Sequence, residues 1–304
     1  MKKKWKVIII SSVCFSVVVG IGAYITCFPY IFRYIFDSSK FNITEKETSN
    51  DIKIMTYNAR GNTTADKYKR SWFYRAKLQF KLIEEEKPDI IGFQECSPIM
   101  ERYYKRHFKG YDFKEPYDKK KSERGGNLII YRSDIFSKQA EGFFYLSNTP
   151  EKKSKDWGSN NYRTCSYVTL QNKDTEKVYN VINVHLDHKS KEARENQTRV
   201  LLEQIYLLNL KNPLILGDFN SGTRSSPFAQ LTEAGLHDSL TYSLTPYEGN
   251  GTTFHKYGEY LNNGRIDYIF VDPSITVNSY NVIEKKIDGE FPSDHNPVVI
   301  NIAK

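Results

Sequence analysis

The sequence predicts an α/β fold in which two β-sheets pack face to face and helices cover their outer sides. Short apolar runs rich in β-branched residues recur along the chain, whereas only two longer stretches have helical spacing, one in each half. Many strands with few helices indicate such a sandwich. The chain has 304 residues, of which 39% are hydrophobic, so it has ample material for a core and is not disordered as a whole.

An apolar segment near the N-terminus predicts one transmembrane helix before this sandwich. The segment runs from Val7 to Phe32 without a formal charge and follows four lysines. Its part before Pro29 would form a helix of roughly 33 Å at about 1.5 Å per residue, enough to cross a hydrocarbon core of about 30 Å. A cleaved signal peptide is the alternative, although the apolar region of a signal normally has about 7–15 residues.

The lysine flank predicts the orientation of this helix. We expect residues 1–6 to stay in the cytoplasm and residues 7–35 to form the anchor or an uncleaved signal. The protein would then be a single-pass protein of the cell membrane, with the domain that follows the anchor on the extracytoplasmic side. Residues 36–50 are polar, lack a core pattern and predict a linker.

Residues 51–304 contain no repeat and no break rich in Pro, Gly or Ser, which predicts one domain. The net charge of +8 is too small to indicate a nucleic-acid partner by itself. Four cysteines without a CxxC pair exclude a zinc ribbon and a disulfide scaffold. A disulfide between Cys96 and Cys165 would suit an exported domain, and two buried thiols are the alternative.

The expected elements of this domain follow in order along the chain. Residues 52–57 alternate as a strand, and residues 72–86 have helical spacing that stops before Pro88. A second helix is expected over residues 192–210. Further strand-like runs occur at residues 90–93, 128–131, 167–170, 178–184, 214–216, 266–271 and 298–302.

Polar residues stand at the ends of several of these strands, where a core would not place them. In chain order they are Asn58, Glu95, His185 with Asp187, Asp218 with Asn220, Asp267, and Asp294 with His295. One such cluster could cap a turn, but six of them indicate a site. Carboxylates suit Mg²⁺ or Mn²⁺, amides orient ligands, and two histidines handle protons or stabilise charge.

The motifs TYN, QE, NVHLDH, GDFN, GRIDYIF and SDHNP occur in this order between Ile52 and Ile302. In this ordered set the sequence resembles the endonuclease/exonuclease/phosphatase superfamily. That superfamily includes DNase I, abasic-site endonucleases, mRNA deadenylases, inositol polyphosphate 5-phosphatases and neutral sphingomyelinases. The resemblance implies a four-layered α/β sandwich and a phosphoester hydrolase with Mg²⁺ or Mn²⁺ as cofactor.

The resemblance also implies which residues form the metal site. Glu95, from the QE motif, is the best candidate metal ligand. Asn58 would help to position the metal site and the phosphate. Asp294 would support the metal or His295.

The remaining motif residues are implied to act on the water and the phosphate. Asp218 would orient or deprotonate the attacking water, and Asn220 would hold the scissile phosphate. His295, oriented by Asp267, would be the general base or a cation that stabilises the phosphate. His185 would contact the phosphate from the other side or assist the leaving oxygen. Water would attack in line, without a covalent enzyme intermediate.

Two further residues are candidate substrate contacts. Arg163 stands at a strand position where a basic residue could contact phosphate. Asp187 could contact substrate, or it could begin the helix that follows it. We expect the protein to be a monomer whose partners are its phosphoester substrate and the membrane.

The leading function is a metal-dependent, nuclease-like phosphodiester hydrolase, with basic residues such as Arg102 and Lys105 as candidates for its groove. The alternative is a sphingomyelinase-like lipid or small-molecule phosphodiesterase or phosphatase. Exposed aromatic residues near the membrane would favour the lipid substrate, and Trp157 and residues 143–145 are candidates. A non-catalytic binding module is a third hypothesis, but it predicts the loss of at least one motif residue, and none is lost.

Overall fold

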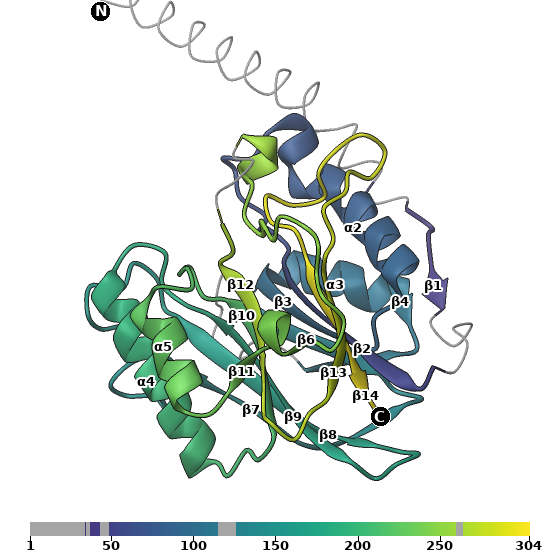
Figure 1. Ribbon diagram of the computed structural model, residues 1–304. Helices are drawn as coiled ribbons and strands as arrows, with labels where there is room; N and C mark the ends of the chain where they lie inside the picture. The colour runs from purple at the N-terminus through teal and green to yellow at the C-terminus, as the bar shows by residue number, and fades with distance from the viewer. Residues whose placement is uncertain (1–33, 35–36, 43–48, 115–125, 260–263) are drawn as a thin grey trace, which may run out of the picture.

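A computed structural model of the chain describes residue 34 and residues 37–42, 49–114, 126–259 and 264–304. In it, two six-stranded sheets pack face to face, and helices cover the outer face of each sheet (Figure 1). The α/β sandwich expected from the sequence is therefore confirmed.

The predicted transmembrane anchor, residues 7–35, lies outside the described residues except for Tyr34, as do residues 1–6. Among the described helices, none is long and apolar enough to cross a bilayer.

The first sheet combines strands from both ends of the domain. Its order is β13 (Val277–Val282), β14 (Val298–Ala303), β2 (Asp51–Asn58), β3 (Ile90–Cys96), β6 (Gly126–Arg132) and β5 (Tyr111–Lys114). Strands β2 and β3 are parallel, and every other neighbouring pair is antiparallel.

The second sheet repeats this pattern with the middle of the chain. Its order is β11 (His237–Asp238), β12 (Asp267–Val271), β10 (Pro213–Asp218), β9 (Val178–His185), β8 (Thr164–Asn172) and β7 (Phe136–Tyr145). Here β9 and β10 are the parallel pair, flanked by antiparallel neighbours.

Each parallel pair needs a crossover connection, and the two helices expected from the sequence provide it. Helix α2 (Trp72–Glu86) connects β2 to β3 and has the expected bounds. Helix α4 (Lys191–Leu207) connects β9 to β10 and ends earlier than expected. Helix α3 (Pro98–His107) lies beside α2, and α5 (Ser226–Glu233) lies beside α4, which completes four layers (Figure 1).

Short elements complete the described chain. Helix α6 (Ser239–Tyr242) follows β11, and the 3₁₀ turns η2 (Tyr68–Arg70) and η3 (Lys256–Gly258) lie in loops. Strand β1 (Phe41–Asn42) pairs in parallel with β4 (Phe108–Lys109).

The expected linker is attached to the domain in its described first part. The Tyr103 hydroxyl donates a hydrogen bond of 2.7 Å to Asp37, and the ring of Tyr34 stacks on that of Tyr103. Because β1 also pairs with β4, residues 37–42 extend along α3 and β4 and are not a free tether. The linker expected over residues 36–50 stays a prediction.

The apolar core occupies the three spaces between the four layers. Ile54 and Leu216 lie between the two sheets, Phe93 lies under α2 and α3, and Leu201 packs α4 onto the second sheet. Cys96 and Cys165 are buried free thiols in different core clusters, so the thiol alternative is confirmed.

A buried polar link joins the sheets close to the ends of their parallel strands. Asn183 in β9 donates to the carbonyls of Phe93 and Leu128, over 2.9 and 3.0 Å. Its carbonyl accepts a bond of 2.7 Å from Gln94. A Cβ atom at Gly92 would lie 3.1 Å from Asn183, so the glycine allows the sheets to approach here. Buried and satisfied polar groups of this kind fix the relative position of the two sheets.

Candidate active site

The polar residues expected to form the site do lie together, because their strands place them at the same end of the two sheets. Asn58, His185 and Asp218 end the parallel strands β2, β9 and β10. Asp267 begins β12, which runs antiparallel to β10. In the register of the second sheet, Asp218 lies directly between His185 and Asp267. The sheet topology alone thus brings these side chains to one place.

Asn58 connects the two sheets at this edge. Its Nδ2 atom donates to Asp218 Oδ2 over 2.9 Å and lies 3.3 Å from Glu95 Oε1. Its own oxygen accepts a bond of 3.0 Å from the Arg60 backbone amide. The side chain is buried, so each of these bonds is shielded from water.

Glu95 faces the cleft from an irregular point of β3. Its φ of 59° is in the left-handed region, and the pairing of β3 with β6 shifts register between Phe93 and Cys96. The Gly61 amide donates to Glu95 Oε2 over 2.8 Å. Burial alone would raise the pKa of Glu95, but the Gly61 amide and the Arg60 charge hold it below its usual value. The carboxylate is therefore ionised.

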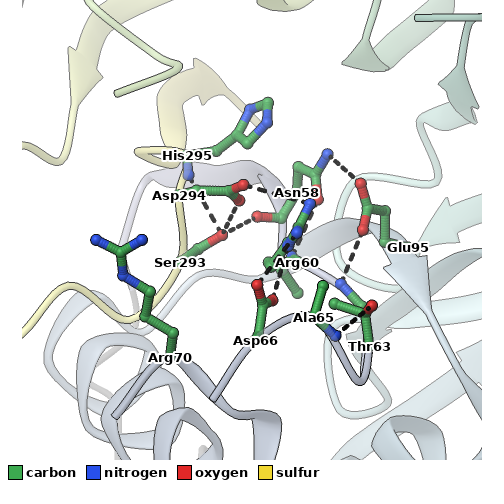
Figure 2. A network of polar contacts seen from close by, with 12 residues as sticks. Asn58, Arg60, Thr63, Ala65, Asp66, Arg70, Glu95, Ser293, Asp294 and His295 are labelled. Atoms are coloured by element: carbon green, nitrogen blue, oxygen red, sulfur yellow. Dashed lines mark hydrogen bonds and ion pairs between the residues drawn. The ribbon is translucent and has the colours of Figure 1, made fainter. Parts of the chain in front are cut away.

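Arg60 connects two acidic residues near Glu95. Its Nε atom donates to Asp66 over 2.8 Å, and a terminal nitrogen lies 3.6 Å from Asp294 Oδ2 (Figure 2). The bond to Asp66 raises the pKa of Arg60 further, so it stays charged. Burial raises the pKa of Asp294, which Arg60 partly offsets. Sequence reasoning missed Arg60, although it stands two residues after Asn58.

His295 and Asp267 form a buried pair, with 2.9 Å between His295 Nδ1 and Asp267 Oδ2. Burial by itself lowers the pKa of His295, but the Asp267 charge and hydrogen bond raise it to about 10. The imidazole is thus a cation at neutral pH. Its Nε2 atom lies 3.9 Å from Asp218 Oδ2, and the Phe254 ring packs at 4.9 Å between centroids.

Asp218 and His185 have the opposite electrostatic character. Burial and the nearby Asp267 charge raise the pKa of Asp218 to about 7. Burial and the Arg163 charge lower the pKa of His185 well below its usual value, so this imidazole is neutral. His185 Nε2 lies 3.4 Å from Asp218 Oδ2. A carboxylate that titrates near neutrality beside a neutral imidazole is suited to accept a proton.

Asn220 lies where the sequence places it. Its backbone, with a φ of 48°, turns so that its amide donates to Asp218 Oδ1 over 2.9 Å. Its side-chain nitrogen donates to the Leu186 carbonyl over 3.0 Å, and the residue lines the cleft.

Arg163 lies one residue before β8, not within a strand as expected. Its side chain lines the cleft and is only 10% exposed. One terminal nitrogen is 3.3 Å from His188 Nδ1, and Nε has no hydrogen-bond partner among the described residues. A buried guanidinium with an unsatisfied donor is suited to bind an anionic oxygen.

Asp187 differs from the expected substrate contact. It is fully buried and does not line the cleft, and its carboxylate accepts bonds of 2.9 Å from the amides of Asn160, Lys189 and Ser190. Its Oδ2 atom is 3.9 Å from Arg163 Nε. Because these amides satisfy it, Asp187 shapes the turn before α4 and orients Arg163. The alternative role at the start of the helix is the one its contacts support.

The site residues form the floor of a cleft of about 1250 Å³. Arg102, expected from the sequence as a candidate for the groove, lines one wall of the cleft. Other basic and aromatic residues that the sequence did not assign to the site also line it: Arg60, Lys153, Tyr162, Phe254 and Lys256. Tyr162 is 48% exposed, with the ammonium groups of Lys153 and Lys155 at 4.9 and 5.5 Å from its ring centroid.

Two groups of residues have the chemistry to hold a divalent cation. Ligand atoms of Asp218, Asp267 and His295 lie within 4.8 Å of one another. However, His295 is protonated by its pairing with Asp267, and an imidazolium has no lone pair for a metal. Glu95 is an ionised carboxylate that faces the cleft, next to the Asn58 amide. Asp294 also lines the cleft, and carboxylate oxygens such as those of Glu95 and Asp294 are the ligands that Mg²⁺ and Mn²⁺ prefer.

Comparisons with known proteins agree with this geometry. A structure of an endonuclease/exonuclease/phosphatase family protein from Bacteroides thetaiotaomicron is 29% identical, with a TM-score of 0.76 over 83% of this chain and 97% of that one. A mannosyl-6-phosphatase from Bacteroides thetaiotaomicron is 28% identical, with a TM-score of 0.75 over 83% of this chain and 100% of that one.

An uncharacterised protein of Acanthamoeba polyphaga mimivirus is 27% identical over 82% of this chain and 99% of its own length. The family model described as "Endonuclease/Exonuclease/phosphatase family" matches residues 55–295, which include the whole floor of the cleft. With this match across most of its length, the chain belongs to the endonuclease/exonuclease/phosphatase family.

Proposed function

We propose that this phosphoester hydrolase of the family requires a divalent cation and activates water for in-line attack on phosphorus. The observation that carries the proposal is the position of Asp218. Its carboxylate lies 3.4 Å from the neutral His185 and 3.9 Å from the protonated His295. A proton acceptor and a cation therefore meet at one point of the cleft floor, as attack on an anionic phosphoester requires.

Glu95, with Asn58 and Asp294, would hold Mg²⁺ or Mn²⁺, which when bound neutralises charge on the phosphate oxygens. Asp218 orients the attacking water and takes its proton. The His295 imidazolium, held by Asp267, stabilises negative charge on the phosphoryl oxygens. Catalysis then comes from positioning and charge neutralisation.

Three other residues act on the substrate in this proposal. Arg163 lines the cleft and offers its guanidinium to a phosphoryl oxygen. Asn220, in the cleft, holds the scissile phosphate beside Asp218. His185 is neutral, so it contacts the phosphate from the other side, or assists the leaving oxygen, without adding a charge.

The first candidate substrate is a phosphodiester within a longer polyanion, as in a single-stranded nucleic acid. Arg102 and Lys153 lie on the cleft walls and come from α3 and from the loop between β7 and β8. Cations beyond the scissile phosphate are useful only to a substrate with further anionic groups. The exposed Tyr162 ring is a surface on which a base can stack.

The second candidate is the phosphate monoester of a sugar. It is favoured by the 28% identity to the Bacteroides mannosyl-6-phosphatase, whose entire chain is covered by the match. The site residues named above serve a monoester equally well, because the chemistry at phosphorus is shared.

The lipid substrate loses the support that the sequence offered. Phe144 and Tyr145 are buried in β7, and Trp157 packs against the core under α4. These aromatic residues do not form an exposed membrane-binding surface. The binding-module alternative is disfavoured because Glu95, Asp218 and His295 are all present at the cleft.

We also propose that the full chain is a monomer anchored in the cell membrane with this domain outside the cytoplasm. The support is the uncharged segment from Val7 to Phe32 and the lysines before it. Protease added to intact cells should digest the domain, and a domain that remains protected until lysis would contradict the orientation. The molar mass in detergent, measured by light scattering, tests the monomer.

The activity is tested with the full chain in detergent and three substrates: bis-p-nitrophenyl phosphate, a single-stranded oligonucleotide and mannose 6-phosphate. Each is assayed with Mg²⁺, with Mn²⁺ and with chelator. Metal-dependent cleavage of the oligonucleotide favours the first candidate, and release of phosphate from the sugar alone favours the second. Asp218→Asn should abolish turnover, and no hydrolysis of any substrate by folded wild type would contradict the proposal.

A further inference from the structure

Arg75 is a fully buried arginine whose hydrogen bonds all go to backbone carbonyls. Buried arginines are usually paired with a carboxylate, as Arg132 is with Asp89 at 3.2 Å. The guanidinium of Arg75 instead donates to the carbonyls of Arg70, Ala59, Arg60, Gly61 and Pro292, over 2.7, 2.8, 2.8, 3.4 and 3.2 Å. The charged guanidinium thus forms its hydrogen bonds with main-chain carbonyl groups.

Gln79 lies one turn further along α2 and binds two of the same carbonyls. It donates to Ala59 over 2.6 Å and to Pro292 over 2.9 Å. Its own oxygen accepts a bond of 2.8 Å from Tyr104 in α3. Residues four apart share a helix face, so Arg75 and Gln79 present one polar surface of α2 to both loops.

These carbonyls belong to two loops that both contribute groups to the active site. The loop after β2 carries the Gly61 amide, which binds Glu95 Oε2 over 2.8 Å. The loop before β14 continues from Pro292 into Asp294 and His295. The two loops also meet where the Ser293 hydroxyl donates to the Asn58 carbonyl over 2.7 Å (Figure 2).

We propose that Arg75, supported by Gln79, is a positioning residue that holds the loop after β2 and the loop before β14 in a fixed relative position. The Gly61 amide at Glu95 and the side chains of Asp294 and His295 are positioned with these loops. This inference rests on the proposed function for the roles of Glu95 and His295. Arg75 touches no substrate, and its effect passes through the Gly61 amide and the Pro292 carbonyl.

A lysine cannot replace Arg75 in this arrangement. An ammonium group has three donors at one point, whereas the guanidinium has five donors in a planar fork. Arg75→Lys would leave the carbonyls of Arg60 and Gly61 without their side-chain donor, because Gln79 does not reach them. The Gly61 amide would then shift relative to Glu95. A displacement of about 1 Å in a catalytic group can lower the rate by about 100-fold.

Arg132 supplies a matched control. It is also buried, but it pairs with Asp89 and Asp134. Asp89 directly precedes β3, so this pair lies at the end of the strand that is opposite the active site. The experiment compares wild type, Arg75→Lys and Arg132→Lys in the full chain. The measured quantities are Tm, kcat, KM and the affinity for Mn²⁺ from electron paramagnetic resonance.

We expect Arg75→Lys to lower kcat by about 10- to 100-fold and to weaken Mn²⁺ binding several-fold, while Arg132→Lys lowers Tm but leaves kcat within about twofold. Equal kcat values in the two variants at temperatures where both are folded would overturn the proposal.

Hydrogen exchange separates this proposal from the proposed function. The backbone amides of residues 59–61 and 292–295 should exchange faster in Arg75→Lys than in Arg132→Lys, whether or not the wild type hydrolyses a phosphoester. Unchanged exchange in both loops would overturn the positioning role even if the enzyme is active. Faster exchange in an inactive protein would support the role while the proposed function fails.

Discussion

Asn58 and Asp218 join the two sheets, because Asn58 Nδ2 donates to Asp218 Oδ2 over 2.9 Å. Asn58 ends β2 of the first sheet, and Asp218 ends β10 of the second. The same amide lies 3.3 Å from Glu95, so one neutral side chain separates the buried carboxylate of Asp218 from the half-buried carboxylate of Glu95. The site therefore exists only when the two sheets pack in one relative position, which the buried link at Asn183 helps to fix.

A negative charge at position 58 should therefore destabilise the folded protein. Asn58→Asp would place a third carboxylate between Asp218 and Glu95, and like charges at this distance repel strongly when buried. In chelator at pH 8 we expect Tm to fall by about 5–10 °C. The loss should shrink below pH 5, where carboxylates take up protons. Asn58→Ala is the control, and a pH dependence as large in Asn58→Ala would contradict the explanation.

The ionised Asp218 carboxylate should lower the free energy of unfolding at alkaline pH, although the proposed mechanism requires it. Burial and Asp267 raise its pKa from 3.8 to about 7 in the folded state. A group with a raised pKa stabilises the fold when protonated, and that contribution is lost as the pH rises from 3.8 through about 7. In chelator at pH 8, Asp218→Asn should therefore have a higher Tm than wild type, and the difference should vanish near pH 4. A variant with lower Tm at pH 8 would contradict this assignment.

The His295–Asp267 pair should set the alkaline limit of activity. Asp267 keeps His295 protonated, with a pKa of about 10, so wild-type kcat should stay high until the pH approaches that value. In Asp267→Asn the pKa of His295 should fall, because burial lowers it and the largest opposing charge is gone. We expect kcat at pH 8 to drop by about 100-fold and to recover partly near pH 6. A pH profile of unchanged shape would show that His295 does not act as a cation.

The fold could be predicted where a local pattern had one interpretation. Helix α2 is amphipathic and is followed by Pro88, so its bounds were predicted correctly. Helix α4 was predicted too long because Leu210 is apolar, yet Leu210 is buried from the loop after the helix. Helix α3 was missed although Met100, Tyr103 and Tyr104 have helical spacing, because the helix is only ten residues long and half of it is charged or histidine. Strands β5 and β13 are edge strands with mixed polarity and show no clear alternation.

The active-site residues likewise include some that could be predicted from the sequence and others that could not. Its floor could be predicted because each residue follows or begins a strand within a recognisable motif. Arg75 could not be predicted, since its contact with Pro292 spans 217 positions of the chain and has no local signature. Two roles stayed open for Asp187 because a carboxylate after a strand looks the same whether it faces a cleft or three backbone amides.

Arg102 distinguishes the two candidate substrates. It is an exposed residue of α3 on the cleft wall, whereas Arg199 is exposed on α4 and does not line the cleft. If the substrate is a single-stranded polyanion, Arg102→Gln should raise its KM by about 5- to 10-fold at low salt and reduce the slope of log KM against log salt by about 0.7–1. Arg199→Gln should leave both unchanged. For mannose 6-phosphate neither variant should alter KM, because a single phosphate is bound on the cleft floor. An equal rise of KM for both substrates in Arg102→Gln would mean that this arginine contacts the scissile phosphate itself, and would contradict an extended binding surface.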